Sequence, residues 1–335
     1  MKARRRGARK GDKTRGLGTV FVTGASGRLG RRLCAEFLES GAEVRGLVSR
    51  RQQMNLLPPG TVPFVGDIAD QHTLRKACSG ADYVYHLAAI VSQRSAAQNE
   101  IIRVNSHGTA SVLEAAESEK VGRLVFSSSV DVYGTRRGDV LTEESVLRPT
   151  DMYGHSKMLA ERQIASFGSS LKYTILRAAA IYGPGFEGSF FKVFRMLRTG
   201  KLYIIGDGNN HMALVHINDV VRAMALAGEK RSGSAVYNLG DGKQYTQAHL
   251  IGMAAGLLGV PAPRKHLGMF AARLFARAAG ISADELRFIT ADRVLDITRI
   301  RKGLGFVPRE GMERSAAELV DMFMLGYKGE TGEIP

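Results

Sequence analysis

The sequence predicts an α/β protein in which a doubly wound parallel sheet is joined to a smaller C-terminal domain. The first observation is a short apolar strand, a glycine-rich turn and an amphipathic helix near the start of the chain. The second is the alternation of strand and helix patterns through the first half, which is typical of a parallel sheet. The third is the looser second half, where glycine-rich turns at 183–185, 206–208 and 240–242 separate shorter elements.

The opening unit predicts a binding site for a diphosphate. Thr19–Val22 is a β-branched and aromatic run typical of a buried strand, and Arg28–Glu39 carries apolar residues at helical spacing. Between them, the spacing Gly24-x-x-Gly27-x-x-Gly30 permits a tight turn, close approach of phosphates and close packing of the helix on the strand. The free N–H groups and partial positive charge at a helix N-terminus suit such an anion. A plain structural turn is the alternative, because this spacing differs from Gly-x-Gly-x-x-Gly.

Further strands and helices follow in alternation. We expect strands at Glu43–Val48, Val62–Val65, Tyr83–Leu87, Leu124–Ser127 and Tyr173–Leu176, and helices at Thr73–Cys78, Ile101–Glu117 and Met152–Phe167. They predict a Rossmann-type dinucleotide-binding domain at 17–178, to which a segment near 212–240 returns, and a mainly substrate-binding domain at 179–335. Within the latter, Leu267–Ile281 has arginines among apolar residues and is either one wall of the domain or a helix lying on a membrane.

The basic charge of the chain is concentrated at its N-terminus. The 335 residues have a formal net charge of +15, and Met1–Gly16 carry +7 of it with almost no apolar residue. We expect residues 1–16 to be a disordered tail that makes at most weak contact with a membrane surface or another polyanion, with no specific nucleic-acid site. The tail lacks the apolar core of a secretory signal. Because the only two cysteines, Cys34 and Cys78, fall in predicted helices, we expect a cytoplasmic protein without disulfides.

The end of the second predicted strand favours NADP over NAD. In this kind of fold, an acidic residue there binds the ribose 2′-hydroxyl of NAD, whereas a basic one accommodates the 2′-phosphate of NADP. Here Val48 is followed by Ser49 and Arg50, and no carboxylate is present. A hydroxyl and a guanidinium can both donate to phosphate. The alternative is that the arginine simply faces solvent.

Tyr153 and Lys157 are the candidate proton-transfer groups. Their spacing places a phenol and an ammonium on one face of a helix. A free phenol has a pKa of about 10, and a nearby cation is expected to lower that pKa toward neutrality, where a general acid or base works best. Ser129 ends the fifth strand at the edge where ligands of such sheets bind, so it can hydrogen-bond the oxygen that Tyr153 protonates.

Together these segments resemble the extended short-chain dehydrogenases/reductases of the NAD-dependent epimerase/dehydratase family. The resemblance spans about residues 19–240 and includes Thr23–Gly30, Gly66-Asp67-Ile68, His86–Ala89, Asn105-x-x-Gly108-Thr109, Ser127–Gly134, Tyr153–Lys157 and Arg177–Pro184. It implies hydride transfer with NAD(P), in which Ser129, Tyr153 and Lys157 are catalytic and Asn105 supports the proton relay. The expected dinucleotide contacts are Thr23, Gly24, Ser26, Gly27, Arg28, Leu29, Gly30, Ser49, Arg50, Asp67, Ile68, Leu87, Ala88, Ala89, Ser127, Tyr153, Lys157 and Ala180.

Several of these polar residues also have simpler structural roles. Asn105 could bond nearby backbone, His86 could pack beneath the cofactor, and Asp219 could cap the helix that follows it. None of the eight histidines has paired ligand spacing, so no metal is expected.

Two apolar positions bear on the substrate. Family members that act on nucleotide sugars usually carry Asn where Ala180 stands and Arg where Met212 stands. These departures resemble 3β-hydroxysteroid dehydrogenases and dihydroflavonol reductases, so we expect an oxidoreductase acting on a secondary hydroxyl or ketone of a small-molecule substrate with an apolar body. Nucleotide-sugar epimerisation is the alternative, since basic side chains nearby could bind phosphate. A non-catalytic protein on the same fold is a further alternative, against which the complete Ser129, Tyr153 and Lys157 set argues. The resemblance also implies a homodimer formed through the helices at Ile101–Glu117 and Met152–Phe167.

Overall fold

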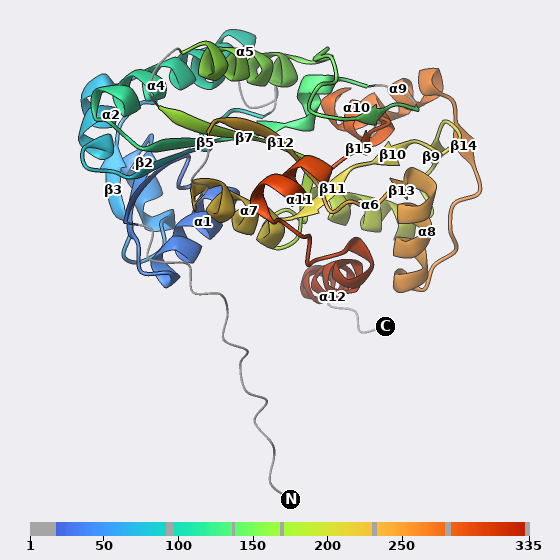
Figure 1. Ribbon diagram of the computed structural model, residues 1–335. Helices are drawn as coiled ribbons and strands as arrows, with labels where there is room; N and C mark the ends of the chain where they lie inside the picture. The colour runs from blue at the N-terminus through green and yellow to red at the C-terminus, as the bar shows by residue number, and fades with distance from the viewer. Residues whose placement is uncertain are drawn as a thin grey trace, which may run out of the picture.

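A seven-stranded parallel sheet forms the centre of the computed structural model, which describes residues 18–91, 97–135, 138–167, 171–229, 233–278 and 283–331 (Figure 1). The strand order is β12-β7-β5-β4-β1-β2-β3, so the order reverses between β1 and β4. The strands are β1 (Thr19–Thr23), β2 (Glu43–Val48), β3 (Val62–Val65), β4 (Tyr83–His86), β5 (Arg123–Ser129), β7 (Lys172–Ala178) and β12 (Ala235–Leu239). In open α/β sheets, ligands bind beyond the carboxyl ends of the strands at such a reversal.

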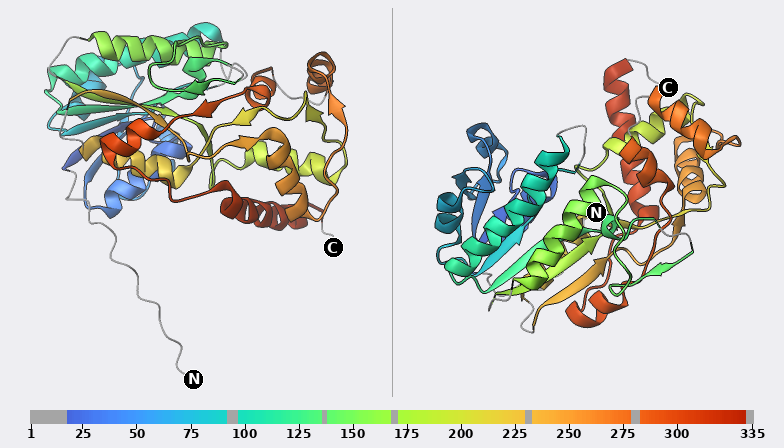
Figure 2. Two further views of the ribbon diagram at one scale, coloured as in Figure 1. Left: turned by 45° about the vertical axis from the view of Figure 1, so that its right-hand side comes forward. Right: turned by 90° about the horizontal axis from the view of Figure 1, so that it is seen from above.

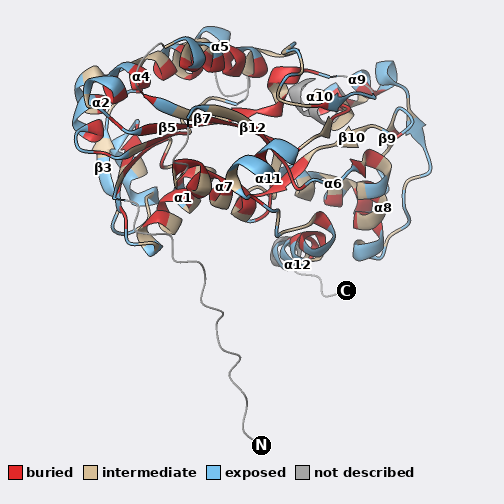
Figure 3. Ribbon diagram, viewed as in Figure 1, coloured by how far each residue is buried: buried red, intermediate tan, exposed pale blue. Residues whose placement is uncertain are grey.

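Helices cover both faces of this sheet. Figure 1 shows α2 (Gln71–Cys78), α4 (Gly108–Ser118) and α5 (Met152–Ser166) on one face, and α1 (Arg28–Glu39) and α7 (Ile217–Glu229) on the other. Two apolar clusters, one on each face, fill the space between the layers, and the central strands of the sheet are buried, whereas the edge strand β3 is mostly exposed (Figure 3). The predicted doubly wound parallel sheet is therefore confirmed.

The predicted elements of the first half agree with the structure to within about two residues at most ends, as expected for boundary assignments. Two features differ. A 3₁₀-helix, η1 (Arg51–Leu56), follows β2 where no element was expected, and the helix expected at Ile101–Glu117 is divided. It consists of α3 (Gln98–Ile102), a π-helical turn η2 (Arg103–His107) and α4. Cys34 in α1 and Cys78 in α2 are buried and unpaired.

The C-terminal part consists of short strand pairs and helices beside the carboxyl edge of the sheet (Figure 2). The strands are β6 (Val140–Leu141), β8 (Ala180–Tyr182), β9 (Ile204–Ile205), β10 (His211–Met212), β11 (Leu214–His216), β13 (Tyr245–Thr246), β14 (His266–Leu267) and β15 (Val294–Leu295). The helices are α6 (Gly188–Arg198), α8 (Gln247–Leu258), α9 (Met269–Ala278), α10 (Ala283–Thr290), α11 (Thr298–Leu304) and α12 (Met312–Thr331), and a further 3₁₀ turn, η3 (Val130–Tyr133), follows β5. A third apolar cluster joins α6, α8 and α12.

Some sequence predictions fall outside the described residues. The basic tail at 1–16 is one of them, and the end of the Leu267–Ile281 interval beyond α9 is another. Within the described ranges, no helix combines the length and apolar character needed to cross a bilayer.

Candidate active site

The glycine turn between β1 and α1 has the shape that a diphosphate requires. Gly24 has a φ of +68°, and a Cβ there would lie 2.8 Å from the backbone nitrogen of Ala88. A Cβ on Gly30 would lie 2.2 Å from the carbonyl oxygen of Gly24, so only glycine lets α1 approach the turn this closely. Gly27 precedes α1 without any side-chain cap, and the first turn of α1 contains no acidic residue. The exposed, uncapped N-terminus therefore presents free N–H groups to an anion, and these residues fit a dinucleotide.

Thr23 and His86 form the buried floor beside this turn. The Thr23 hydroxyl lies 2.7 Å from His86 Nδ1 and accepts hydrogen bonds from the N–H groups of Leu87 and Ala88. His86 Nε2 lies 2.9 Å from the Thr109 hydroxyl. Burial lowers the pKa of His86 to about 3, and the charge of Lys157 contributes to this. His86 is therefore a neutral packing residue that fixes the loop after β4. This agrees with the structural role considered for it from the sequence, in which it packs beneath the cofactor.

The other expected dinucleotide contacts lie along the same edge of the sheet. Ser26, Arg28 and Leu29 open α1, whereas Leu87, Ala88 and Ala89 follow β4. Arg28 is exposed, and its guanidinium carbon lies 5.8 Å from the ring centroid of Phe186 in the C-terminal part. The dinucleotide-binding turn and the C-terminal domain are thus in direct contact.

Residues at the ends of β2 and β3 complete that edge. Ser49 and Arg50 are both exposed, and the Ser49 hydroxyl and the Arg50 N–H donate to the side-chain oxygen of Gln53. Among the described residues, the Arg50 guanidinium forms no ion pair, so it is available to bind an anion. After β3, Ile68 is buried, whereas Asp67 is exposed and its carboxylate accepts from Arg103 at 2.8 Å. This hydrogen bond holds the pKa of Asp67 below its usual value.

Ser129, Tyr153 and Lys157 converge at the carboxyl end of β5. Tyr153 and Lys157 lie one turn apart near the start of α5, and Ser129 is the last residue of β5. Lys157 is buried, and its Nζ donates to the Ser127 carbonyl at 2.7 Å. The same Nζ lies 4.6 Å from the ring centroid of Phe126 and 5.9 Å from that of Tyr153. The structure therefore brings the three predicted catalytic residues together.

The pKa values in this cluster differ from the expectation. Burial raises the pKa of the Tyr153 phenol and the negative charge of Asp131 adds to that rise, whereas hydrogen bonding with Ser129 opposes it. Burial also lowers the pKa of Lys157 to about 7, although Glu161 acts in the opposite direction. The expectation that Lys157 brings the Tyr153 phenol toward neutrality is wrong for the chain by itself. The loss of solvation outweighs the attraction between the two groups, because the ammonium bonds Ser127 rather than the phenol.

Asn105 lies in the π-helical turn η2, and both its side-chain oxygen and its side-chain nitrogen form hydrogen bonds with nearby residues. Its Oδ1 accepts from the Ile90 N–H at 2.7 Å, and its Nδ2 donates to the Ile90 carbonyl and to the Ser156 hydroxyl, both at 2.9 Å. This is the backbone-binding role that was the alternative for Asn105. Because Ser156 directly precedes Lys157, Asn105 also fixes the position of α5 at the candidate site, and its part in a proton relay stays a prediction.

An ion pair joins the candidate catalytic serine to the C-terminal domain. The Ser129 hydroxyl donates to Asp131 Oδ2 at 2.9 Å, and Asp131 Oδ1 pairs with Arg293 at 2.8 Å. Arg293 is buried and also donates to the carbonyl of Gly134 at 3.0 Å. Sequence reasoning missed both residues, although Asp131 stands only two positions after Ser129.

Asp292 extends this connection to a second strand pair. Its carboxylate accepts from the backbone N–H of His211 at 2.7 Å and lies 3.0 Å from His211 Nδ1. His211 belongs to β10, next to Met212. The dipeptide Asp292-Arg293 therefore holds β10 and the turn after Ser129 in a fixed relation.

A buried charge network lies beneath the serine turn. Arg177 and Glu161 form an ion pair at 2.7 Å, with side chains only 6% and 5% exposed, so both charges depend on each other for compensation. Glu161 also accepts from the Ser128 hydroxyl at 2.5 Å. Arg177 donates to the Tyr133 hydroxyl, which donates to Asn238 Oδ1 at 2.6 Å.

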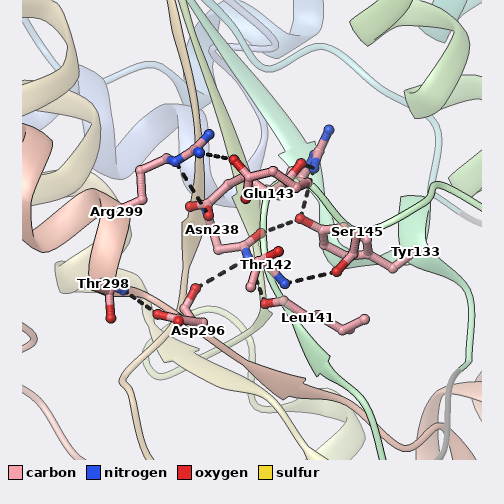
Figure 4. A network of polar contacts seen from close by, with 11 residues as sticks. Tyr133, Leu141, Thr142, Glu143, Ser145, Asn238, Asp296, Thr298 and Arg299 are labelled. Atoms are coloured by element: carbon pink, nitrogen blue, oxygen red, sulfur yellow. Dashed lines mark hydrogen bonds and ion pairs between the residues drawn. The ribbon is translucent and has the colours of Figure 1, made fainter.

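Figure 4 shows how Asn238 extends this network to the C-terminal segments. Its side-chain amide donates to the carbonyls of Leu141 and Asp296, and its backbone N–H donates to Glu143 at 2.8 Å. Glu143 in turn lies 3.7 Å from Arg299 of α11. Through these contacts, β12, β6 and α11 are all connected to the turn that follows Ser129.

The positions that bear on the substrate lie just beyond the sheet. Ala180 and Met212 are half-buried: Ala180 begins β8 one residue after the end of β7, and Met212 pairs with Tyr245 of β13. No cluster of three or more His, Cys, Asp or Glu side chains suited to a metal ion occurs among the described residues.

Asp219 has a role other than the expected cap. It lies within the first turn of α7, which begins at Ile217, so it cannot be the residue preceding that helix. Its carboxylate accepts from the backbone N–H groups of Arg309 and Glu310 and pairs with Arg222 at 2.8 Å. Asp219 therefore anchors the segment before α12, and the prediction that it caps α7 is wrong.

Comparisons with known proteins agree with this geometry. Residues 20–240 match the model of the NAD dependent epimerase/dehydratase family. The protein y4nL of Sinorhizobium fredii is 31% identical over 334 residues, covering 88% of this chain and 93% of y4nL. A 4-hydroxy-2-methyl-3-oxo-4-farnesyl-3,4-dihydroquinoline-1-oxide ketoreductase of Stigmatella aurantiaca is 31% identical over 228 residues, covering 67% of this chain and 68% of the relative. The structure of MoeE5 in complex with UDP-glucose and NAD superposes with a TM-score of 0.75 at 29% identity, covering 92% of this chain and all of MoeE5.

Proposed function

Because this chain belongs to the NAD-dependent epimerase/dehydratase family, we propose that it is an oxidoreductase whose chemistry is carried by Ser129, Tyr153 and Lys157. The chain is an enzyme of the extended short-chain dehydrogenase/reductase type, with NAD-dependent epimerases and reductases among its relatives. The observation that carries the assignment of residues is their convergence at the end of β5, on the same edge of the sheet as the glycine turn of Gly24 and Gly30, with only β4 between β5 and β1. A phenol, a hydroxyl and an amine at that place can donate hydrogen bonds to a substrate carbonyl or hydroxyl group and transfer a proton to or from its oxygen.

In the proposed mechanism, the nicotinamide supplies or accepts a hydride at its C4 when a dinucleotide is bound. Tyr153 gives a proton to the substrate oxygen during reduction and takes one during oxidation. In the structure the single hydroxyl proton of Ser129 is donated to Asp131, so the hydroxyl must rotate away from Asp131 before it donates to the same substrate oxygen. The Ser127 carbonyl holds the Lys157 Nζ at 5.9 Å from the centroid of the Tyr153 ring. When protonated, this amine attracts the phenolate that forms, although the attraction is smaller than the effect of burial on the phenol.

The proposed substrate is a secondary alcohol or ketone with an apolar body. Half-buried Ala180 and Met212 stand at the two positions where nucleotide-sugar enzymes of the family usually carry polar anchors. Replacing a charge-assisted contact by an apolar side chain removes about 1.5–3 kcal/mol of binding free energy for a diphosphate. The Stigmatella relative, whose name describes a ketoreductase for a farnesylated quinoline, supports this choice.

Nucleotide-sugar epimerisation is the second candidate function. It is favoured by the similarity to MoeE5, which was solved with UDP-glucose and NAD. An epimerase uses the same proton transfer twice and keeps its dinucleotide between the two steps. Native mass spectrometry of the purified protein separates the candidates, because a retained dinucleotide favours the epimerase and an exchangeable one favours the reductase.

The decisive experiment for the residue roles is Tyr153→Phe. We expect turnover to fall by about 10²–10⁴-fold, while the dissociation constant for the dinucleotide stays within a few-fold, because only the proton donor is removed. Turnover is followed by NADPH oxidation with a panel of apolar ketones and, separately, by conversion of UDP-sugars. Tyr173→Phe is the matched control, since Tyr173 is also half-buried but lies at the opposite end of the sheet. Unchanged turnover in Tyr153→Phe would reject the proposed role.

We further propose that NADP binds more tightly than NAD. The support is the exposed pair Ser49 and Arg50 and the lack of a carboxylate at the end of β2. Arg50→Gln is expected to weaken binding of NADPH and to leave NADH nearly unchanged, because a guanidinium–phosphate contact contributes about 1.5–3 kcal/mol. Arg75→Gln, an exposed arginine of α2, is the control. Equal affinities of the wild-type protein for NADPH and NADH would contradict the proposal.

A homodimer formed through α4 and α5 is also part of the proposal. These helices lie side by side on one face of the sheet (Figure 2), with Glu114 and Arg162 exposed on their outer surfaces. The solution mass, measured by light scattering, tests it. A protein that remains monomeric at all concentrations would exclude the dimer.

A further inference from the structure

Helix α9 presents a face that combines large apolar and cationic side chains. Phe270 and Leu274 are 78% and 61% exposed, and Met269 is also exposed. Arg273 and Arg277 are exposed on the same side, since residues three and four apart share one face of a helix. This outer face of α9 is defined here as Met269, Phe270, Arg273, Leu274 and Arg277.

The opposite side of α9 already supplies the packing that the helix needs. Ala272 and Ala276 are buried in a small apolar cluster with Leu286 of α10. The Phe275 ring contacts that of Tyr203 at 5.5 Å. Among the described residues, none covers the outer face, which lies at the margin of the C-terminal domain (Figures 1 and 3).

The charged residues of α9 and of the segment just before it are all basic. No aspartate or glutamate occurs between Asp241 and Asp284, whereas Arg264 and Lys265 stand just before α9 and are exposed. A cationic surface that carries a protruding phenylalanine and leucine is the pattern of helices that lie in the headgroup region of a membrane. A second copy of the chain would bring like charges together at this face, which disfavours self-association.

We propose that the outer face of α9 docks the protein on a bilayer that contains anionic phospholipid. Phe270 and Leu274 enter the boundary between headgroups and acyl chains, and the arginines bind lipid phosphates. The outer face of α9 is linked to the candidate active site through the fold. Helix α9 packs against α10, and the chain continues from α10 to Asp292 and Arg293, which contact the segment after Ser129. This docking does not depend on the proposed reaction, and it can be tested without any substrate.

Tryptophan fluorescence tests the insertion directly, since the chain contains no tryptophan. We expect Phe270→Trp to shift its emission to shorter wavelength, and to be quenched by brominated lipid, when vesicles of phosphatidylcholine and phosphatidylglycerol are added. Leu325→Trp is the matched control, because Leu325 is 73% exposed on α12, and its emission should stay unchanged. The basic N-terminal tail could hold the protein near the vesicles through charge alone, but it would not place residue 270 in the lipid. An unchanged emission of Phe270→Trp on these vesicles overturns the proposal.

Vesicle sedimentation of the full chain gives a second, independent measurement. Arg273→Gln/Arg277→Gln should partition about 30-fold more weakly to anionic vesicles, at about 1 kcal/mol for each basic residue near the surface and about 1.4 kcal/mol per tenfold change. Phe270→Ser/Leu274→Ser should lose at least as much, whereas Arg195→Gln/Arg198→Gln on α6 should change little. Equal partitioning of the α9 variants and the wild-type protein overturns the proposal. A fall in solution mass caused by Phe270→Ser/Leu274→Ser also overturns it, because that result identifies the face as a contact between copies.

Discussion

Replacing Lys157 by methionine should stabilise the folded protein at low pH, although it removes a catalytic residue. Lys157 is 2% exposed, and burial lowers its pKa from 10.5 to about 7. Between these two values the unfolded chain holds a proton at this side chain and the folded chain does not. Since stability rises with pH wherever the unfolded state binds more protons, Lys157 makes the wild-type protein more stable as the pH increases from about 7 to 10.5.

The size of this effect follows from the pKa difference. Each pH unit inside the window changes the free energy of unfolding by about 1.4 kcal/mol, so the full window gives a ceiling of about 5 kcal/mol. Methionine fills a similar volume without a charge and has no such dependence. The stability advantage of Lys157→Met over the wild-type protein should therefore shrink by about 2.7 kcal/mol between about pH 6 and pH 9.

Urea unfolding of both proteins at a series of pH values, without added dinucleotide, measures this difference. The slope with pH is the diagnostic quantity, because the lost hydrogen bond from Nζ to the Ser127 carbonyl adds only an offset that is nearly independent of pH. Lys172→Met is the matched control, since Lys172 is exposed on β7 and its replacement should give no such slope. A free-energy difference between Lys157→Met and the wild-type protein that stays constant over this range would refute the reasoning.

Two other perturbations test the structural basis of the site. Arg177→Met should lower the free energy of unfolding by about 3–5 kcal/mol, because it leaves the buried carboxylate of Glu161 uncompensated, and Arg177→Met/Glu161→Met should regain much of this loss. Denaturant unfolding checks both, and a double variant as unstable as the single one would contradict the account. Gly30→Ala should weaken dinucleotide binding and cost at least about 1–3 kcal/mol, because its Cβ would meet backbone atoms at 2.2 Å and 2.8 Å. Gly252→Ala on α8, where nothing lies within 4 Å of the added Cβ, is the control, and equal behaviour of the two glycine variants would show that the turn tolerates a side chain.

The dinucleotide-binding half could be predicted because its signals are local. Strands such as β1 and β5 are buried on both faces and therefore appear as continuous apolar runs, and glycines mark the first turn. The spacing of Tyr153 and Lys157 is equally local, so a helix places both side chains correctly. The π-helical turn at Asn105 was not predictable in this way, because Arg103–His107 contains no glycine or proline that would mark an interruption of the helix.

The contacts made by the C-terminal half could not be predicted from the sequence. Arg293 bonds Gly134 across 159 residues, and no periodic pattern in β15 or α10 indicates that contact. The strands of this half are two or three residues long, too short for an alternation of apolar and polar positions to be recognised. Asp131 was accessible in principle, because a carboxylate two residues after a strand-end serine can reach its hydroxyl, but its charge partner comes only from the fold.

Burial is the largest cause both of the raised pKa of Tyr153 and of the lowered pKa of Lys157. Moving the proton from the phenol to the amine would create two buried charges, and the Lys157 amine donates to the Ser127 carbonyl rather than to the phenol. Asp131 opposes that transfer further, because it raises the pKa of Tyr153. The resting arrangement therefore keeps the proton on Tyr153, where it is available to a carbonyl oxygen. In the proposed reaction this favours reduction of a ketone near neutral pH, whereas oxidation of an alcohol requires the phenol to lose its proton first and should become faster as the pH rises.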